Sequence, residues 1–381
     1  MLNTAFTIVI GILVALAAVN ILVIIHELGH FFTAKFFKVK VEEFGIGFPI
    51  PGRIWGKKIG ETDYTVNWLP AGGFVRLFGE DSDVNDPRSF SGRPAWQRTI
   101  IIVAGVSVNL IFAFILFTFI IGFSGWKSEL PLVFVDNQFP FGKQESQIAT
   151  TYVAVDSAAS VAGLTPADKI LFVDGKKIGT AEELRAAVAV SEGLPITLEV
   201  ENSLTEEKRS LVASPRYNEE IKRYQLGIDF VEVAIISYES LPEKILVGPL
   251  HSANMVQYQF VVLRSLVTKS IAEGDAAPVR DNVSGVVGIV GVFIALIQSF
   301  GFGALVPLLT VMALLSLLLG IINVLPIPAV DGGRLFFVLI ELFTRKKVNA
   351  DVERLIHAVG FGVLIIIFVL VTFNDVLKFF G

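Results

Sequence analysis

The sequence predicts a polytopic α-helical membrane protein with four transmembrane helices, a membrane-associated β-rich loop and one extracytoplasmic α/β domain. Hydrophobic residues make up 53% of the 381 residues and charged residues only 18%, which is too apolar for an ordinary soluble enzyme. Four segments are long and apolar enough to span a bilayer. Most of the acidic residues gather in one polar region between the second and third of these segments.

Each predicted span is an apolar run with few or no charges: Ala5–Ile25, Thr99–Phe123, Gly303–Leu325 and Leu355–Asn374. The first has no basic residue before it and no small-residue cleavage site, so we interpret it as an uncleaved span and not a signal peptide. The uncharged stretch before the third span is too long for a single crossing. Its first part, Val283–Gln298, is therefore predicted to be an interfacial or re-entrant element.

The loops between the spans differ in composition. The loop after the first span alternates short β-type runs with Pro and Gly, and predicts the strands Val41–Gly47, Arg53–Lys58, Tyr64–Trp68 and Gly73–Phe78. Ser124–Asp281 is the only stretch large enough for a soluble domain. Near its end, Val247–Ala272 is predicted to be an amphipathic helix that lies on the membrane or guards the entrance to the site.

This pattern divides the chain into four parts. Residues 1–123 hold the first two spans and the β-rich loop, and residues 124–235 hold the water-exposed domain. Residues 236–300 hold the amphipathic and interfacial helices, and residues 301–381 hold the last two spans. Basic residues fill the two loops that we expect to face the cytoplasm: Lys35, Lys38, Lys40, Arg93, Arg98, Arg345, Lys346, Lys347 and Arg354. Both termini and the soluble domain are therefore expected outside the cytoplasm.

The chemistry is concentrated where the first span ends, in the run His26-Glu27-Leu28-Gly29-His30. Two histidines four residues apart lie on one face of a helix and can bind one zinc ion, while the adjacent Glu27 can act as general base. The alternative is a solvated polar helix end. An ionisable cluster at membrane depth is costly unless it is paired or metal-bound, which favours the functional interpretation. With no cysteine in the chain, a metal must sit on His, Asp or Glu.

A catalytic zinc site needs a third protein ligand. After the third span the chain reads Asn323-Val-Leu-Pro-Ile-Pro-Ala-Val-Asp331-Gly-Gly, where two prolines end the helix. The basic loops place Asp331 on the same membrane side as His30, so its carboxylate can complete a His-His-Asp site. The alternative is a helix stop in which Asp331 caps the next helix near Arg334.

The pairing of HELGH with NVLPIPAVDGG resembles the site-2 protease family of intramembrane zinc metalloproteases, most closely the bacterial regulator-of-sigma-E protease branch. The stretches at 69–81 (LPAGGFVRLFGED), 90–109 (FSGRPAWQRTIIIVAGVSVN) and 371–375 (VTFND) resemble further segments of that family. Val106 and Val286 stand where the family often has proline; neither departure touches the proposed ligands. The stretch Val161–Gly175 resembles a PDZ domain, placed at about 147–215, and the chain has room for one such domain. The groove of this domain either binds a peptide end or filters substrates by size.

The resemblance implies peptide-bond hydrolysis within the membrane. Zn²⁺ held by His26, His30 and Asp331 would activate water, and Glu27 would take its proton. The edge-strand candidates Gly73, Phe74, Val75, Arg76 and Leu77 would hold the substrate extended, or form an ordinary hairpin strand. Asn323 would bind the substrate backbone or oxyanion, or pack between helices. Asn109 is more simply a packing residue than a site residue, and His251 and His357 are expected to be structural or interfacial.

The resemblance also implies the partners and the location. The expected substrates are single-pass membrane proteins such as anti-sigma factors, and leftover signal peptides, cut in regulated intramembrane proteolysis in the bacterial cytoplasmic membrane. Membrane lipids are expected partners, and the net charge of −5 argues against nucleic acid. Two rivals are a catalytically silent PDZ-bearing scaffold and a metal transporter. Intact Glu27 and Asp331 argue against the first, and the scarcity of polar residues in spans two to four argues against the second.

Overall fold

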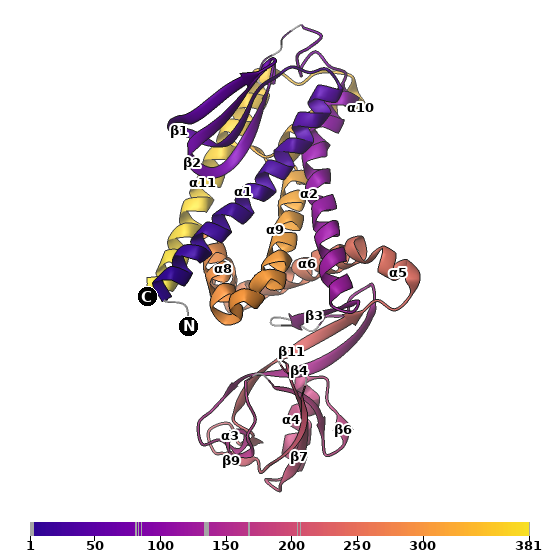
Figure 1. Ribbon diagram of the computed structural model, residues 1–381, viewed down its shortest axis with the longest axis vertical. Helices are drawn as coiled ribbons and strands as arrows, with labels where there is room; N and C mark the ends of the chain where they lie inside the picture. Colours follow the sequence, from indigo (N-terminus) through magenta and orange to yellow (C-terminus); the bar gives the residue numbers. More distant parts are fainter. Residues whose placement is uncertain are drawn as a thin grey trace. The chain divides into compact units, whose positions relative to one another are not determined.

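The structure is a computed structural model that describes residues 4–80, 82, 84, 86–132, 137–166, 168–203, 205 and 207–380. Two compact units make up the chain (Figure 1): the first comprises Met1–Ile120 and Gly274–Gly381, and the second Ile121–Glu273. Asp81 and Ala167, which belong to motifs quoted above, lie outside the described residues.

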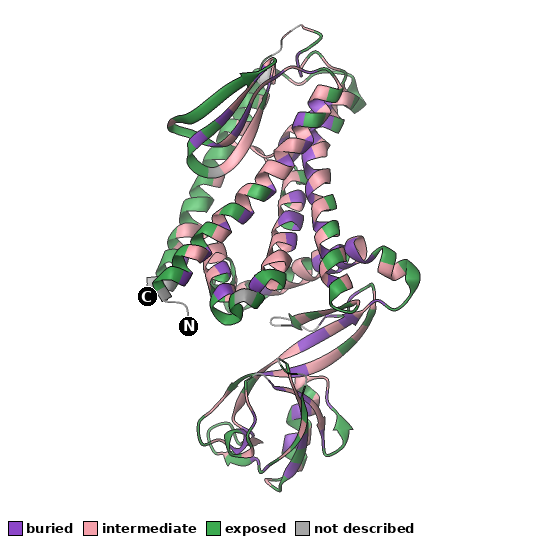
Figure 2. Cartoon of the chain, in the orientation of Figure 1, coloured by how far each residue is buried: buried purple, intermediate pink, exposed green. Residues whose placement is uncertain are grey.

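Among the described residues, four helices are long and apolar enough to cross a membrane, which confirms the predicted spans: α1 (Thr4–Phe36), α2 (Ala95–Phe123), α9 (Leu305–Val324) and α11 (Ala350–Phe380). α1 continues as one helix through the histidine motif, because nothing between His26 and Phe36 breaks it. Most residues along α11 are exposed (Figure 2), and many of them are large and apolar, as expected for a helix that faces lipid.

Shorter helices complete the first unit. They are α7 (Ala277–Asn282), α8 (Val286–Phe300), a 3-10 turn (Gly301–Ala304) and α10 (Asp331–Thr344). The element predicted at Val283–Gln298 is thus a helix, α8, which packs Phe293 against Ala15 and Ala18 of α1. The Asp375 carboxylate of α11 accepts hydrogen bonds from the backbone N–H groups of Gly285 (2.9 Å) and Gly288 (2.8 Å), and so holds the start of α8.

The β-rich loop forms two long strands, β1 (Val41–Ile59) and β2 (Thr62–Leu77), that bend back on themselves. The first arm of β1 pairs with both arms of β2: Phe44 lies opposite Tyr64 on one side and Val75 on the other. The second arm of β1 pairs with the first arm of β2, as in Lys57 opposite Tyr64. The four predicted strand segments correspond to these four arms. The arm that contains Gly73–Leu77 has a paired neighbour on one side only, among the described residues, so it is an edge strand.

The second unit is built on a sheet whose main path runs β3-β11-β4-β5-β7-β8, with β6 paired to β5. Its strands are β3 (Lys127–Leu132), β4 (Lys143–Val153), β5 (Asp168–Val173), β6 (Lys176–Lys177), β7 (Ile196–Asn202), β8 (Lys208–Ala213) and β11 (Ile228–Ser237). The helices α3 (Ala158–Ala162) and α4 (Ala181–Val190) contribute to its core. A small hairpin of β9 (Arg216–Asn218) and β10 (Arg223–Gln225) precedes β11.

Two predicted features of this unit are present. The Asp174-Gly175 pair forms the tight turn between β5 and β6, with both residues at positive φ, the conformation that glycine adopts readily. The helix predicted from Ala181 is α4, which begins with a capping box between Thr180 and Glu183.

The remaining helices of the second unit follow β11. They are α5 (Leu241–Ile245) and α6 (Val247–Glu273), and α6 matches the helix predicted at Val247–Ala272. A buried polar cluster joins α6 to the sheet: the Tyr238 hydroxyl lies 3.0 Å from His251 Nδ1, and Asn254 Nδ2 donates to the same hydroxyl (3.1 Å). Burial lowers the pKa of His251 to about 4, so this histidine is neutral near pH 7. This is the structural role expected of His251.

Candidate metal centre

The side chains of His26, His30 and Asp331 meet at one point. His26 and His30 lie one turn apart on the same face of α1, and Asp331 is the first residue of α10. Asp331 Oδ2 lies 2.8 Å from His26 Nε2 and 3.1 Å from His30 Nε2, and the two Nε2 atoms are 3.1 Å apart. Three ligand atoms within 4.8 Å of one another can share one metal ion.

The loop before α10 is shaped to bring Asp331 to this point. α9 ends at Val324, and the chain turns through Pro326 and Pro328 before α10 begins. The helix cap is Val330, with no side-chain hydrogen bond, so the Asp331 carboxylate does not cap the helix and is directed at the histidines. The alternative in which Asp331 serves as a cap is thereby excluded.

Two glycines allow the first turn of α10 to press against this loop. A Cβ at Gly332 would lie 1.9 Å from the carbonyl oxygen of Leu325, and one at Gly333 would lie 2.5 Å from that of Ile327. Only glycine fits such contacts with backbone. His357 of α11 holds the same loop by accepting a hydrogen bond from the backbone N–H of Ala329 (2.9 Å). His357 is therefore structural, as expected.

α2 crosses α1 closely beside the histidines. A Cβ at Gly29 would lie 2.6 Å from the carbonyl oxygen of Ala104, and one at Gly105 would lie 2.4 Å from His30 Nε2 and 2.9 Å from His26 Cε1. The missing side chain of Gly105 thus provides the space beside the metal-binding atoms. We assigned Gly105 no role from the sequence, although it directly precedes the departure at Val106.

α2 also contacts the far side of each imidazole ring. His30 Nδ1 lies 2.8 Å from the carbonyl oxygen of Ile101, to which its N–H donates. His26 Nδ1 lies 3.2 Å from the side-chain amide of Asn109, which is fully buried. Asn109, which the sequence analysis treated mainly as a packing residue, therefore lies against a candidate ligand.

Glu27 and the edge strand border one cavity of about 510 Å³ together with His30 and Asp331. Glu27 and Val75 of the edge strand line this cavity side by side. A methyl group at Gly73 would lie 3.7 Å from Glu27 Cγ, so the strand passes directly beside this carboxylate. Phe74, Val75, Arg76 and Leu77 line the cavity. Asn323 is half-buried near the end of α9 and is not among the described residues that line it.

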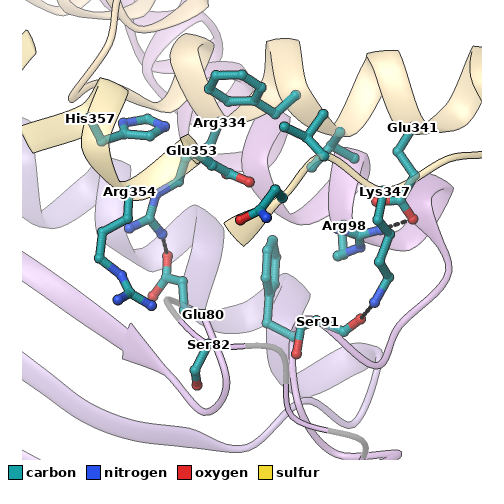
Figure 3. Close-up of a pocket in the computed structure, with 15 residues that line it drawn as sticks. Glu80, Ser82, Ser91, Arg98, Arg334, Glu341, Lys347, Glu353, Arg354 and His357 are labelled. Atoms are coloured by element: carbon teal, nitrogen blue, oxygen red, sulfur yellow. Dashed lines mark hydrogen bonds and ion pairs between the residues drawn. The ribbon is translucent and has the colours of Figure 1, made fainter. Parts of the chain in front are cut away.

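A second, more polar cavity of about 460 Å³ adjoins the first (Figure 3). The two share Glu80, Phe90 and Arg334 among their lining residues, and Glu80 and Arg334 form an ion pair. Arg334 lies one turn after Asp331, and Glu80 follows the edge strand, where it accepts a hydrogen bond from the Leu77 N–H (3.2 Å). A second, largely buried ion pair joins Arg98 of α2 to Glu341 of α10. Neither ion pair was predicted from the sequence.

The donors suit a zinc ion. Two imidazole nitrogens and one carboxylate oxygen are ligands that zinc accepts, and a three-ligand set leaves a position open for chemistry. The hydrogen bond on the far ring nitrogen of His30 is a further feature expected around a histidine ligand. The residues present therefore fit the metal.

Comparison with known proteins agrees with this geometry. The model of peptidase family M50 matches residues 14–367. Relatives named "Putative zinc metalloprotease" occur in Clostridium perfringens (33% identical, covering 96% of this chain and 98% of the relative) and in Clostridium acetobutylicum (34% identical, 96% and 97%). A third, from Fusobacterium nucleatum, is 32% identical over 97% of this chain and 99% of its own length. The chain therefore belongs to peptidase family M50, the site-2 protease family, and is a zinc metalloprotease.

Proposed function

We propose that the protein cuts peptide bonds within transmembrane segments of single-pass membrane proteins. The observation that carries this proposal is the position of the His-His-Asp cluster: its two histidines lie on a helix long and apolar enough to span a membrane, and His30 and Asp331 share a cavity with an edge strand. An edge strand can bind a second strand through its backbone. A helical substrate hides its carbonyl groups in internal hydrogen bonds, so extension on such an edge would expose the scissile bond.

The residues divide the chemistry among them. His26, His30 and Asp331 would hold the zinc ion, which when bound polarises the scissile carbonyl and makes water a nucleophile near neutral pH. Glu27 accepts the proton of the attacking water and delivers it to the leaving amine. The backbone of Gly73–Leu77 would align the substrate beside Glu27. Asn323 remains a candidate for binding the substrate backbone or oxyanion.

The second unit has a groove that suits a PDZ-like module. The groove, of about 290 Å³, lies between α4 and the start of β11 and is lined by Leu184, Val188, Ala189, Gly227, Ile228 and Phe230 among others. β11 pairs with β4 along its whole length but with β3 only from Glu232 onward. Ile228, Asp229 and Phe230 border the groove beside α4, which would allow an extended peptide to bind along this strand. This supports peptide binding over a purely steric filter.

The basic loops support an orientation with the metal centre near the cytoplasmic side. By the positive-inside rule, both termini and the second unit would then lie outside the cytoplasm of a bacterial inner membrane. Because the chain lacks cysteine, a single introduced cysteine can be labelled from either side of a sealed vesicle. Ser191→Cys in the second unit should react from the outer side, and Lys346→Cys from the cytoplasmic side. Reaction of Ser191→Cys from the cytoplasmic side would reverse the orientation.

The proposed substrates are single-pass proteins already trimmed outside the membrane, such as anti-sigma factors, and signal-peptide remnants. The decisive experiment compares Glu27→Gln with the wild-type protein in cleavage of a single-pass substrate, alongside zinc content. We expect cleavage to be lost and zinc to be retained, because the amide keeps the shape of Glu27 but cannot accept a proton. Cleavage at the wild-type rate by Glu27→Gln would refute the mechanism. Wild-type protein that retains zinc but cuts no membrane substrate would favour the scaffold alternative.

A further inference from the structure

Asn109 occupies an unusual position for a buried amide. It lies in α2, is fully buried, and places Nδ2 3.2 Å from His26 Nδ1. Its other side-chain atom, Oδ1, is buried with no hydrogen-bond partner. Its backbone carbonyl accepts a hydrogen bond from the Ser316 hydroxyl of α9 (2.8 Å). An unsatisfied amide oxygen at this depth is costly, so the arrangement calls for an explanation.

The tautomer of His26 supplies that explanation. His26 Nε2 faces Asp331 Oδ2 and His30 Nε2, so this nitrogen must present its lone pair if the ring binds the metal. A neutral imidazole then carries its proton on Nδ1, which becomes a donor. With Nδ2 of Asn109 toward it, two donors would face each other.

A half-turn of the Asn109 amide removes this conflict. The amide oxygen and nitrogen have nearly the same size, so the turn leaves the packing unchanged. It brings Oδ1 to His26 Nδ1, where it accepts the ring N–H, and the oxygen without a partner gains one. The acceptor at His30 is a backbone carbonyl, that of Ile101, which has no such ambiguity. α2 would then supply one acceptor to each histidine.

We propose that Asn109 is a positioning residue whose amide oxygen accepts the Nδ1–H of His26 and holds Nε2 toward the zinc ion. This inference rests on the proposed role of His26 as a ligand. Asn109 does not itself touch the metal; it selects the tautomer of His26 and fixes the plane of its ring. Such outer partners of metal-binding histidines contribute about 10- to 100-fold to metal affinity.

The test measures zinc affinity of the purified full-length protein by competition with a chelator, so its readout is independent of cleavage. Asn109→Leu keeps the size of the side chain but removes the acceptor, and should weaken zinc binding about 10- to 100-fold. Asn109→Asp keeps an acceptor and should bind zinc within a few-fold of the wild type. Ser316→Ala removes the hydrogen bond to the Asn109 backbone and should leave zinc affinity unchanged.

The outcomes separate the possible roles of Asn109. Wild-type affinity in Asn109→Leu, or an equal loss in Asn109→Leu and Asn109→Asp, would overturn the proposal. A loss in Ser316→Ala as large as that in Asn109→Leu would assign the effect to helix packing and overturn it as well. If Asn109→Leu does not fold, Asn109→Asp still tests the proposal, because an acceptor role predicts retained affinity there and a loss of about 10-fold or more would overturn it. His26→Ala is the separate control: retained zinc there would refute the metal site itself, whatever Asn109 does.

Discussion

Asp331 Oδ2 lies 2.8 Å from His26 Nε2, although 305 positions separate the two residues in the chain. One comes from a helix that is long and apolar enough to cross a membrane, and the other from the first turn of a short helix that follows a proline-rich turn. The contact therefore requires α1, the end of α9 and the start of α10 to be held together. The neighbouring residues that hold them are the best targets for testing the site.

Gly105→Ala should abolish zinc binding and cleavage together. The added methyl group would lie 2.4 Å from His30 Nε2, and a shift of α2 away from the ring would stretch the hydrogen bond from His30 to the Ile101 carbonyl. A displacement of about 1 Å at a reacting centre can cost about 100-fold in rate. Zinc content and cleavage rate are the measurements.

The matched control for this substitution is Gly122→Ala near the other end of α2. A methyl group there would meet Trp126 at 3.7 Å, an ordinary contact. We expect this variant to bind zinc and to cut as the wild type does. Normal zinc content in Gly105→Ala would show that the space beside the histidines is not needed.

Much of this site could be predicted from local patterns. The spacing of His26 and His30 on a helix and the proline-rich turn before Asp331 are local features, and so are the apolar runs of the four spans. The strand at Gly73–Phe78 was predictable from the Pro and Gly residues around it, whereas its place at an edge was expected only from the family resemblance. Each of these depends on residues close together in the chain.

The remaining features depend on how distant segments approach one another. Gly105 lies among apolar residues of a span, and nothing near it in sequence marks it as the point where α2 crosses α1. Glu80 and Arg334 are ordinary surface-type residues until β2 and α10 come together. The two arms of β1 were predicted as separate strands because Pro49 and Pro51 usually end a strand; here they lie where the pairing register shifts.

Exchanging the charges of Glu80 and Arg334 should reveal their coupling. Arg334→Glu places two carboxylates together, and Glu80→Arg places two guanidinium groups together, so each single variant should lose thermal stability and cleavage. The double variant should recover part of the loss, with a coupling energy of about 1–2 kcal/mol. Thermal unfolding in detergent and cleavage rates of all four proteins form the cycle. Losses that simply add would show that the pair does not link α10 to the edge strand.

Filling the groove of the second unit with a large side chain should show whether the groove binds peptides or acts only as a steric filter. Ala189 is exposed on α4 and lines the groove, whereas Ala186, also exposed on α4, is not among its described lining residues. Ala189→Trp should weaken binding of peptides with a free C-terminus about 10-fold or more, and Ala186→Trp should not. The measurement is peptide affinity by fluorescence anisotropy. Equal affinity in both variants, with selectivity for trimmed substrates intact, would favour the steric filter.

The buried His251 should make the second unit sensitive to acid. Burial lowers its pKa to about 4, whereas an unfolded histidine titrates near 6.5. Between pH 6.5 and pH 4, His251 is protonated in the unfolded chain but stays neutral in the folded unit. The stabilising contribution is therefore complete above pH 6.5 and is lost as the pH falls to about 4, by about 3 kcal/mol in total.

Trp126 offers a local probe of this effect, because it is the only tryptophan in the second unit and its carbonyl oxygen accepts a hydrogen bond from the Tyr238 N–H. Trp55, Trp68 and Trp96 are first changed to Phe. Denaturant unfolding is then monitored by the fluorescence of Trp126, which gives the free energy of unfolding of the second unit at each pH. His251→Gln should lower the free energy of unfolding at pH 7, because the contact with Tyr238 is altered. It should also remove most of the fall in that free energy between pH 6.5 and pH 4. An equally steep decline in His251→Gln would mean that other groups, such as carboxylates in ion pairs, cause the acid sensitivity.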